Sequence, residues 1–168
     1  MRQRPYMLIG SPDCTQFPTP PYLNTSRCRD PSAFRRAKIA AIVHLDFVAE
    51  LYREQIEEDH YFLHEHPRWA TSWTEVSSIE QLLEIPSVGL VQGDQCQYGA
   101  EVKRGPERGD AILKQTGVMS NSEAVLEELS RRCDGVNGFC SRPTRTGRQD
   151  KHASCTGRKA KDASRYPR

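Results

Sequence analysis

Apolar and polar positions follow two different periods in the first part of this 168-residue chain. A short apolar run ends at Gly10, and this pattern predicts a buried strand over residues 6–10 that leads into a tight loop. Apolar positions then recur every three or four residues, which predicts a helix over 32–58 with one apolar face. Asp30 can cap the first turn of this helix, and Pro31 suits its first position.

Two further apolar runs predict strands over 60–66 and 87–92, because each is short, apolar or aromatic, and bounded by turn residues. Residues 111–119 predict a weaker strand, and residues 123–132 a short helix. The order strand, helix, strand is typical of a βαβ unit with parallel strands. We therefore predict an α/β fold with a small parallel sheet and flanking helices, in which 6–10, 60–66 and 87–92 are neighbours.

Composition narrows the cellular setting. Hydrophobic residues make up 36% of the chain and charged residues 27%, and no apolar run is long enough to span a membrane. The N-terminal residues lack the apolar stretch of a secretory signal, so the six cysteines are expected to stay reduced. These features predict an intracellular protein, nuclear or cytoplasmic, that is not secreted and does not enter the membrane.

Positive charge is concentrated at the C-terminal end. From Leu129 onward the chain has 11 Lys and Arg against 3 Asp and Glu, a formal charge of +8. Such a tail suits a polyanion such as nucleic acid, and the alternative is a disordered, solvated tail. The basic residues expected to contact nucleic acid are Lys114, Arg142, Arg145, Arg148 and Lys151.

The same region contains four potential metal ligands, Cys133, Cys140, His152 and Cys155. Six, eleven and two residues separate them, which is a looser spacing than in common zinc fingers. Three thiols and an imidazole suit tetrahedral zinc. The alternative is a group of unpaired thiols in a flexible tail.

A thiol and a carboxyl group follow the first two predicted strands. Cys14 lies in the loop after the first strand, and Glu65 lies near the end of the second. Parallel strands end at the same edge of a sheet, so the topology predicts that Cys14 and Glu65 lie close together. The alternative for Cys14 is a small buried side chain without chemistry.

Several segments resemble DNA cytosine-5 methyltransferases in the order that this family has them. Residues 10–17, Gly-Ser-Pro-Asp-Cys-Thr-Gln-Phe, resemble the nucleophile loop, in which a glycine, a small residue, two prolines and a cysteine end a strand. Residues 62–67 resemble the next signature, a strand ending in glutamate, and 88–98 resemble the strand and loop that follow it. Residues 114–121 and 163–167 are similar to segments of the phage-type, methylase-like branch.

This resemblance implies a partial Rossmann-like methyltransferase domain that takes S-adenosylmethionine as the methyl donor and DNA as the substrate. It implies that the Cys14 thiolate adds to C6 of a flipped cytosine and that Glu65 acts as a general acid at the N3 edge. Asp13 replaces the second proline of the motif, and a carboxylate beside a thiol raises the pKa of that thiol.

The donor-binding half of that family precedes the cysteine strand, whereas 13 residues precede Cys14. The expectation is therefore a truncated or decayed methyltransferase-like catalytic half over residues 1–132, inactive alone, followed by a basic tail over 133–168 that is disordered or binds zinc. Such segments also resemble passengers of mobile genetic elements. The alternative is a non-enzymatic nucleic-acid-binding module with a basic, zinc-binding tail.

Overall fold

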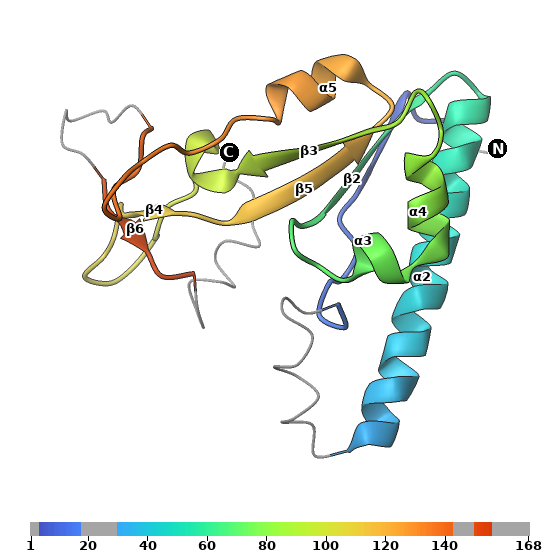
Figure 1. The fold of residues 1–168 in the computed structure, drawn as a ribbon, viewed down its shortest axis with the longest axis horizontal. Helices are drawn as coiled ribbons and strands as arrows, with labels where there is room; N and C mark the ends of the chain where they lie inside the picture. The colour runs from blue at the N-terminus through green and yellow to red at the C-terminus, as the bar shows by residue number, and fades with distance from the viewer. Residues whose placement is uncertain (1–3, 18–29, 143–149, 156–168) are drawn as a thin grey trace. The chain divides into compact units, whose positions relative to one another are not determined.

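The structure is a computed structural model that describes residues 4–17, 30–142 and 150–155. The chain forms two compact units (Figure 1). The first consists of Met1–Val91 and Gly117–Glu128, and the second of Gln92–Thr116 and Leu129–Arg168. Each unit therefore combines two segments of the chain, whereas the sequence analysis divided the chain once, after residue 132. The assignment of 1–132 as a catalytic half stays a prediction.

A four-stranded sheet lies mostly in the first unit, and the last residues of β3 and the first residues of β5 belong to the second. Its strands lie in the order β1 (Met7–Gly10), β2 (Tyr61–Pro67), β5 (Gln115–Ser120) and β3 (Gly89–Asp94). Strands β1 and β2 are parallel, with Leu8 opposite Phe62. The prediction that the first two strands are parallel neighbours is therefore confirmed.

The predicted all-parallel sheet is wrong in one respect, because β5 lies between β2 and β3. Figure 1 shows β5 running in the direction opposite to β3, and the sheet is mixed. The side chain of Asn121 fixes β5 beside β2, because its amide bonds the backbone of Phe62 at 2.9 Å and of His60 at 2.8 Å. Five of the six residues of β5 are buried although two of them, Thr116 and Ser120, are polar. A central strand is buried by neighbours on both sides, and its own sequence was only weakly strand-like.

The long helix α2 (Pro31–Glu57) confirms the predicted helix and its cap. The Asp30 carboxylate accepts hydrogen bonds from the backbone N–H groups of Ser32 at 2.9 Å and Ala33 at 3.0 Å. The Tyr52 ring on its buried face stacks on the Phe62 ring of β2, with centroids 4.5 Å apart. This contact joins the helix to the sheet. No helix among the described residues is long and apolar enough to cross a membrane.

Three shorter helices complete the first unit: α3 (Ser72–Glu75), α4 (Ser77–Leu83) and α5 (Glu123–Glu128). Helix α5 is shorter than the predicted helix over 123–132, because its chain leaves the helix after Glu128 and continues into the second unit. The buried core of the first unit is built around Leu45, Ala49, Tyr52, Phe62, Trp73, Ile79, Leu82 and Met119.

The second unit has little regular structure. It contains the 3-10 turn η1 (Gln95–Tyr98) and the short parallel pair β4 (Ala111–Ile112) and β6 (His152–Ala153). Among its described residues, Val102 and Ile112 are the largest buried apolar side chains, and the others are alanine and cysteine. A core this small contributes little hydrophobic stabilisation, so another interaction is needed to hold the unit together.

Candidate metal centre

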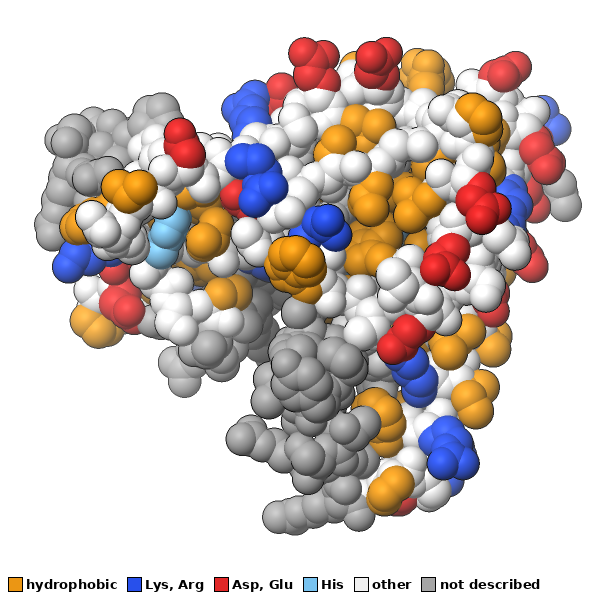
Figure 2. Space-filling model, viewed as in Figure 1, with side chains coloured by type: hydrophobic (Ala, Val, Ile, Leu, Met, Phe, Trp, Pro, Cys, Tyr) orange, Lys and Arg blue, Asp and Glu red, His pale blue; other side chains and the backbone are white. Residues whose placement is uncertain are grey.

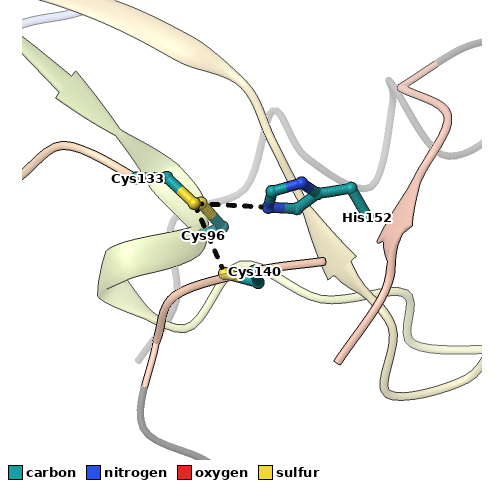
Figure 3. A group of neighbouring side chains, drawn as sticks. All are labelled: Cys96, Cys133, Cys140 and His152. Atoms are coloured by element: carbon teal, nitrogen blue, oxygen red, sulfur yellow. Dashed lines mark hydrogen bonds between the residues drawn. The ribbon is translucent and has the colours of Figure 1, made fainter. Parts of the chain in front are cut away.

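Four side chains converge inside the second unit: Cys96, Cys133, Cys140 and His152 (Figure 3). Cys96 lies in η1, directly after β3, and His152 lies in β6. Cys133 and Cys140 lie at the two ends of the loop formed by residues 134–139. One ligand atom of each residue lies within 4.8 Å of the ligand atoms of the other three. The centre therefore gathers residues that are up to 56 positions apart in the sequence.

The distances match those of a tetrahedral zinc site. Zinc binds sulfur at about 2.3 Å and imidazole nitrogen at about 2.0 Å, which places two sulfur ligands about 3.8 Å apart and sulfur and nitrogen about 3.6 Å apart. The Sγ atoms of Cys133 and Cys140 are 3.8 Å apart, and Cys133 Sγ lies 3.5 Å from His152 Nε2. These two distances fit tetrahedral zinc, and the ligand atoms of all four residues lie within 4.8 Å of one another.

Two backbone turns bring the ligands into position. Gly99 ends η1 in a left-handed conformation with φ 89°, and its N–H bonds the Cys96 carbonyl at 3.3 Å. Gly138 also has a positive φ, 80°, in the turn before Cys140, and its carbonyl accepts the His152 N–H at 2.6 Å. Glycine tolerates this conformation without steric strain, so both turns favour it.

Asp94 anchors the Cys133 backbone beside the centre. Its carboxylate is 1% exposed and accepts hydrogen bonds from the Cys133 N–H at 2.7 Å and from Arg132 Nε at 3.0 Å. The Asp94 N–H in turn bonds the Arg131 carbonyl at 2.9 Å. These contacts connect the end of β3 to the segment that carries Cys133. Residues that hydrogen-bond to a metal ligand without touching the metal hold that ligand in its orientation.

The thiols differ in their protonation. Burial raises the pKa of Cys96, and the neighbouring Cys140 and Cys133 raise it further. Burial also raises the pKa of Cys140. Burial acts in the same direction at Cys133, but hydrogen bonds from Ser141 and the backbone outweigh it and lower the pKa of Cys133 to about 6. One thiolate is therefore present at neutral pH, and a divalent cation would displace protons from the other two thiols.

The structure brings together three of the four predicted ligands and places Cys155 elsewhere. Cys155 packs against the cluster that contains Ala153 and Ile112, and burial raises its pKa. Strand β6 ends at Ala153, so Cys155 lies beyond it, and its thiol is not among the four ligand atoms that converge. Sequence analysis missed Cys96, although its position directly after a predicted strand is a common place for functional side chains.

The predicted nucleic-acid contacts have different environments. Arg142 is engaged inside the second unit, where it bonds Asp150 at 2.6 Å and the Gly109 carbonyl at 3.1 Å. Lys151 is exposed and lies over the Phe139 ring, 5.6 Å from its centroid, and Lys114 lies beside Cys155. Arg145 and Arg148 lie outside the described residues.

The predicted catalytic pair lies in the first unit. Cys14 is partly exposed in the loop after β1, and Glu65 is a buried residue of β2. Ser11, in the same loop as Cys14, donates a hydrogen bond from its hydroxyl to Glu65 Oε2 at 2.6 Å. Asp13 accepts hydrogen bonds from Thr15, which lower the pKa of its carboxyl and keep it charged beside Cys14. The catalytic role of this pair stays a prediction.

Fold and site together define a mixed α/β protein with a candidate Cys3His metal centre. No protein-family model, curated protein or solved structure matches the chain.

Proposed function

We propose that the second unit is a zinc-folded module that binds nucleic acid. The observation that carries the proposal is the convergence of three thiols and one imidazole within 4.8 Å of one another, with 3.8 Å between the sulfurs of Cys133 and Cys140 and 3.5 Å between Cys133 Sγ and His152 Nε2. Three thiols and one imidazole favour zinc over magnesium or calcium, which prefer oxygen ligands. Four protein ligands fill a tetrahedron, so the role of the metal is structural.

The small core of the second unit supports this role. Its described apolar clusters contain alanine, cysteine, Val102, Ile112 and Leu113, and the ligands Cys96, Cys133 and Cys140 belong to one of them. Small units with few buried apolar side chains usually need a metal or disulfides to fold. Zinc bound to these residues would supply folding free energy directly, because the unfolded chain has no preformed site.

The net charge of the second unit indicates the kind of partner that it binds. The second unit has 15 Lys and Arg against 7 Asp and Glu, a formal charge of +8, whereas the first unit has 9 against 15, a charge of −6. A basic surface binds the phosphate backbone of nucleic acid and releases counterions. The loop between Val102 and Asp110 exposes Lys103, Arg104 and Arg108.

Arg142 has a supporting role in this proposal. Its guanidinium bonds Gly109 and Asp150 at the base of the basic loop and lies 3.6 Å from Glu101. A side chain fixed by two carboxylates and a carbonyl positions the loop and does not contact phosphates itself. The exposed residues of the loop would make those contacts.

The test measures metal and nucleic acid separately. Mass spectrometry of the purified protein is expected to find one zinc per chain, and cobalt substitution is expected to give the absorption bands of thiolate ligands in a tetrahedral field.

Fluorescence anisotropy with a labelled DNA or RNA duplex is expected to show binding that weakens steeply with salt. Replacing Lys103, Arg104 and Arg108 by glutamine should flatten the salt dependence, whereas Arg35→Gln in the first unit should not. A metal-free protein that is fully folded would contradict the zinc role, and salt-independent binding would contradict the contact with phosphates.

A second candidate function is that of a cytosine-5 methyltransferase-like domain. It is favoured by the hydrogen bond between Ser11 and Glu65, which ties the thiol loop to β2, and by the parallel register of β1 and β2. In this proposal the Cys14 thiolate forms a bond to C6 of cytosine, and Glu65 donates a proton at N3. A duplex that contains 5-azacytosine, which accepts a thiolate at C6 and a proton at N5 without a methyl donor, should trap the protein covalently, and Cys14→Ser should abolish the trapping. No covalent complex would refute this candidate.

The described residues do not fit the methyl donor of that family. Strands β1, β2 and β3 are each followed by a loop that has no Gly-x-Gly sequence, which is the backbone feature that would cradle the donor. We therefore derive no methyl-transfer step for this chain.

A further inference from the structure

Helix α2 exposes an apolar stripe on the side away from the sheet. Ile39, Val43 and Phe47 follow one another at intervals of four residues and are 56%, 62% and 54% exposed. Hydrophobic side chains are visible along this helix in Figure 2, at the lower right of the view. Residues four apart share one face of a helix, so the three side chains form one continuous patch. Exposed apolar patches of this kind mark contacts with a partner.

The charges along the same helix are arranged against its dipole. Residues 31–45 contain three basic residues and no acidic one, whereas residues 46–57 contain four acidic residues and one basic. The first turn has no acidic side chain and the last turn no basic one. A helix prefers the opposite distribution, because its N-terminal end is positive and its C-terminal end negative. An antiparallel second helix would compensate both ends.

From these two observations we infer that α2 pairs with α2 of a second copy of this chain, antiparallel about a two-fold axis at Val43. In that register Val43 meets Val43 of the partner subunit at the axis. Ile39 meets Phe47 of the partner subunit, and Arg36 meets Glu50 of the partner subunit. Each of these contacts occurs twice, as an isologous interface requires.

The pairing uses only side chains that the structure leaves available on this face. Arg36 and Glu50 are both exposed, and they lie on the same side of the helix as the apolar stripe at its two ends. The opposite side of α2 buries Leu45, Ala49, Tyr52 and Gln55 in the first unit. Forming the dimer therefore needs no change in the fold. This inference is independent of the proposed zinc module, because all of these residues lie in the first unit.

Charge reversal tests the register. Analytical ultracentrifugation of the full chain over a range of protein concentrations should show a monomer–dimer equilibrium. Arg36→Glu places two carboxylates opposite each other at both ends and should raise the dissociation constant by about tenfold or more. The double variant Arg36→Glu/Glu50→Arg restores opposite charges and should return the constant to within about threefold of the original. Arg35→Glu, outside the central stripe, is the matched control.

Cysteine crosslinking tests the direction of the helices. Val43→Cys places two thiols at the axis and should give a covalent dimer under mild oxidation, above the background of the unmodified protein. Ile39→Cys should not, because its counterpart in the antiparallel register is Phe47. Crosslinking of both variants to the same extent would indicate parallel helices and overturn the inference. A protein that stays monomeric at all concentrations, or a charge swap that fails to restore dimers lost in Arg36→Glu, would overturn it as well.

Discussion

Replacing Cys96 or Cys155 by serine tests which of the two cysteines binds the metal. The structure places Cys96 in the centre, whereas the sequence analysis predicted Cys155. Structural zinc contributes about 10–16 kcal/mol in small zinc-binding peptides, which is about 3 kcal/mol for each of four ligands. Cys96 has its sulfur within 4.8 Å of the other three ligand atoms, so Cys96→Ser should weaken zinc binding by about 100-fold. Cys155 contacts an apolar cluster, so Cys155→Ser should leave zinc affinity unchanged and lower stability by about 1 kcal/mol or less.

A competitive titration with a chromophoric zinc chelator measures this difference. Cobalt-substituted protein gives an independent readout, because the thiolate-to-cobalt absorption should fall by about a third in Cys96→Ser and stay constant in Cys155→Ser. Loss of zinc in Cys155→Ser, with retention in Cys96→Ser, would refute the geometry described above.

The pH dependence of zinc binding gives a further check on the same site. Burial raises the pKa of Cys96 and of Cys140, so both thiols are protonated at pH 7 in the metal-free protein and must release protons on binding. Zinc affinity should therefore rise with pH around neutrality. It should fall more steeply below pH 6, because the pKa of Cys133 is about 6 and this thiolate then takes up a proton too. An affinity that is constant between pH 5 and pH 8 would contradict this assignment.

Three other predictions concern the stability of the first unit and the residue that anchors Cys133 beside the metal centre. Burial lowers the pKa of His64 from 6.5 to about 3, so the neutral imidazole is favoured in the folded state above pH 6.5. Urea titrations should show this stability being lost as the pH falls toward 3, by up to about 4–5 kcal/mol, and His64→Gln should flatten that dependence. Asp94→Ala removes the acceptor of the Cys133 N–H and should weaken zinc binding by about tenfold in the chelator assay, with an unchanged affinity counting against the anchoring role. Gly10→Ala makes the new Cβ overlap with the buried Tyr52 hydroxyl and should lower the free energy of unfolding by about 1–3 kcal/mol, and an undiminished thermal midpoint would contradict this contact.

The sequence by itself determined the elements whose pattern is local. The apolar period and the Asp30–Pro31 start predicted α2 with an error of one residue at each end, because capping and amphipathic spacing act within a few residues. The parallel pairing of β1 and β2 was also predictable, since a strand, a long helix and a strand connect in one favoured way. The cysteines and His152 near the C-terminus also indicated a zinc site, because thiols and imidazoles are zinc ligands wherever the fold brings them together.

Only the tertiary structure decided which residues complete that site and how the sheet is ordered. Strand β5 takes the place between β2 and β3 through hydrogen bonds of Asn121 to residues about sixty positions away, and no local pattern encodes such a contact. Cys96 joins the centre because β3 ends beside the segment that Asp94 holds. Cys155 is excluded because it packs against the apolar cluster of Ile112 and Ala153 and not beside the other ligands. The sequence shows which residue types can bind a metal, whereas the fold decides which of those side chains lie close together.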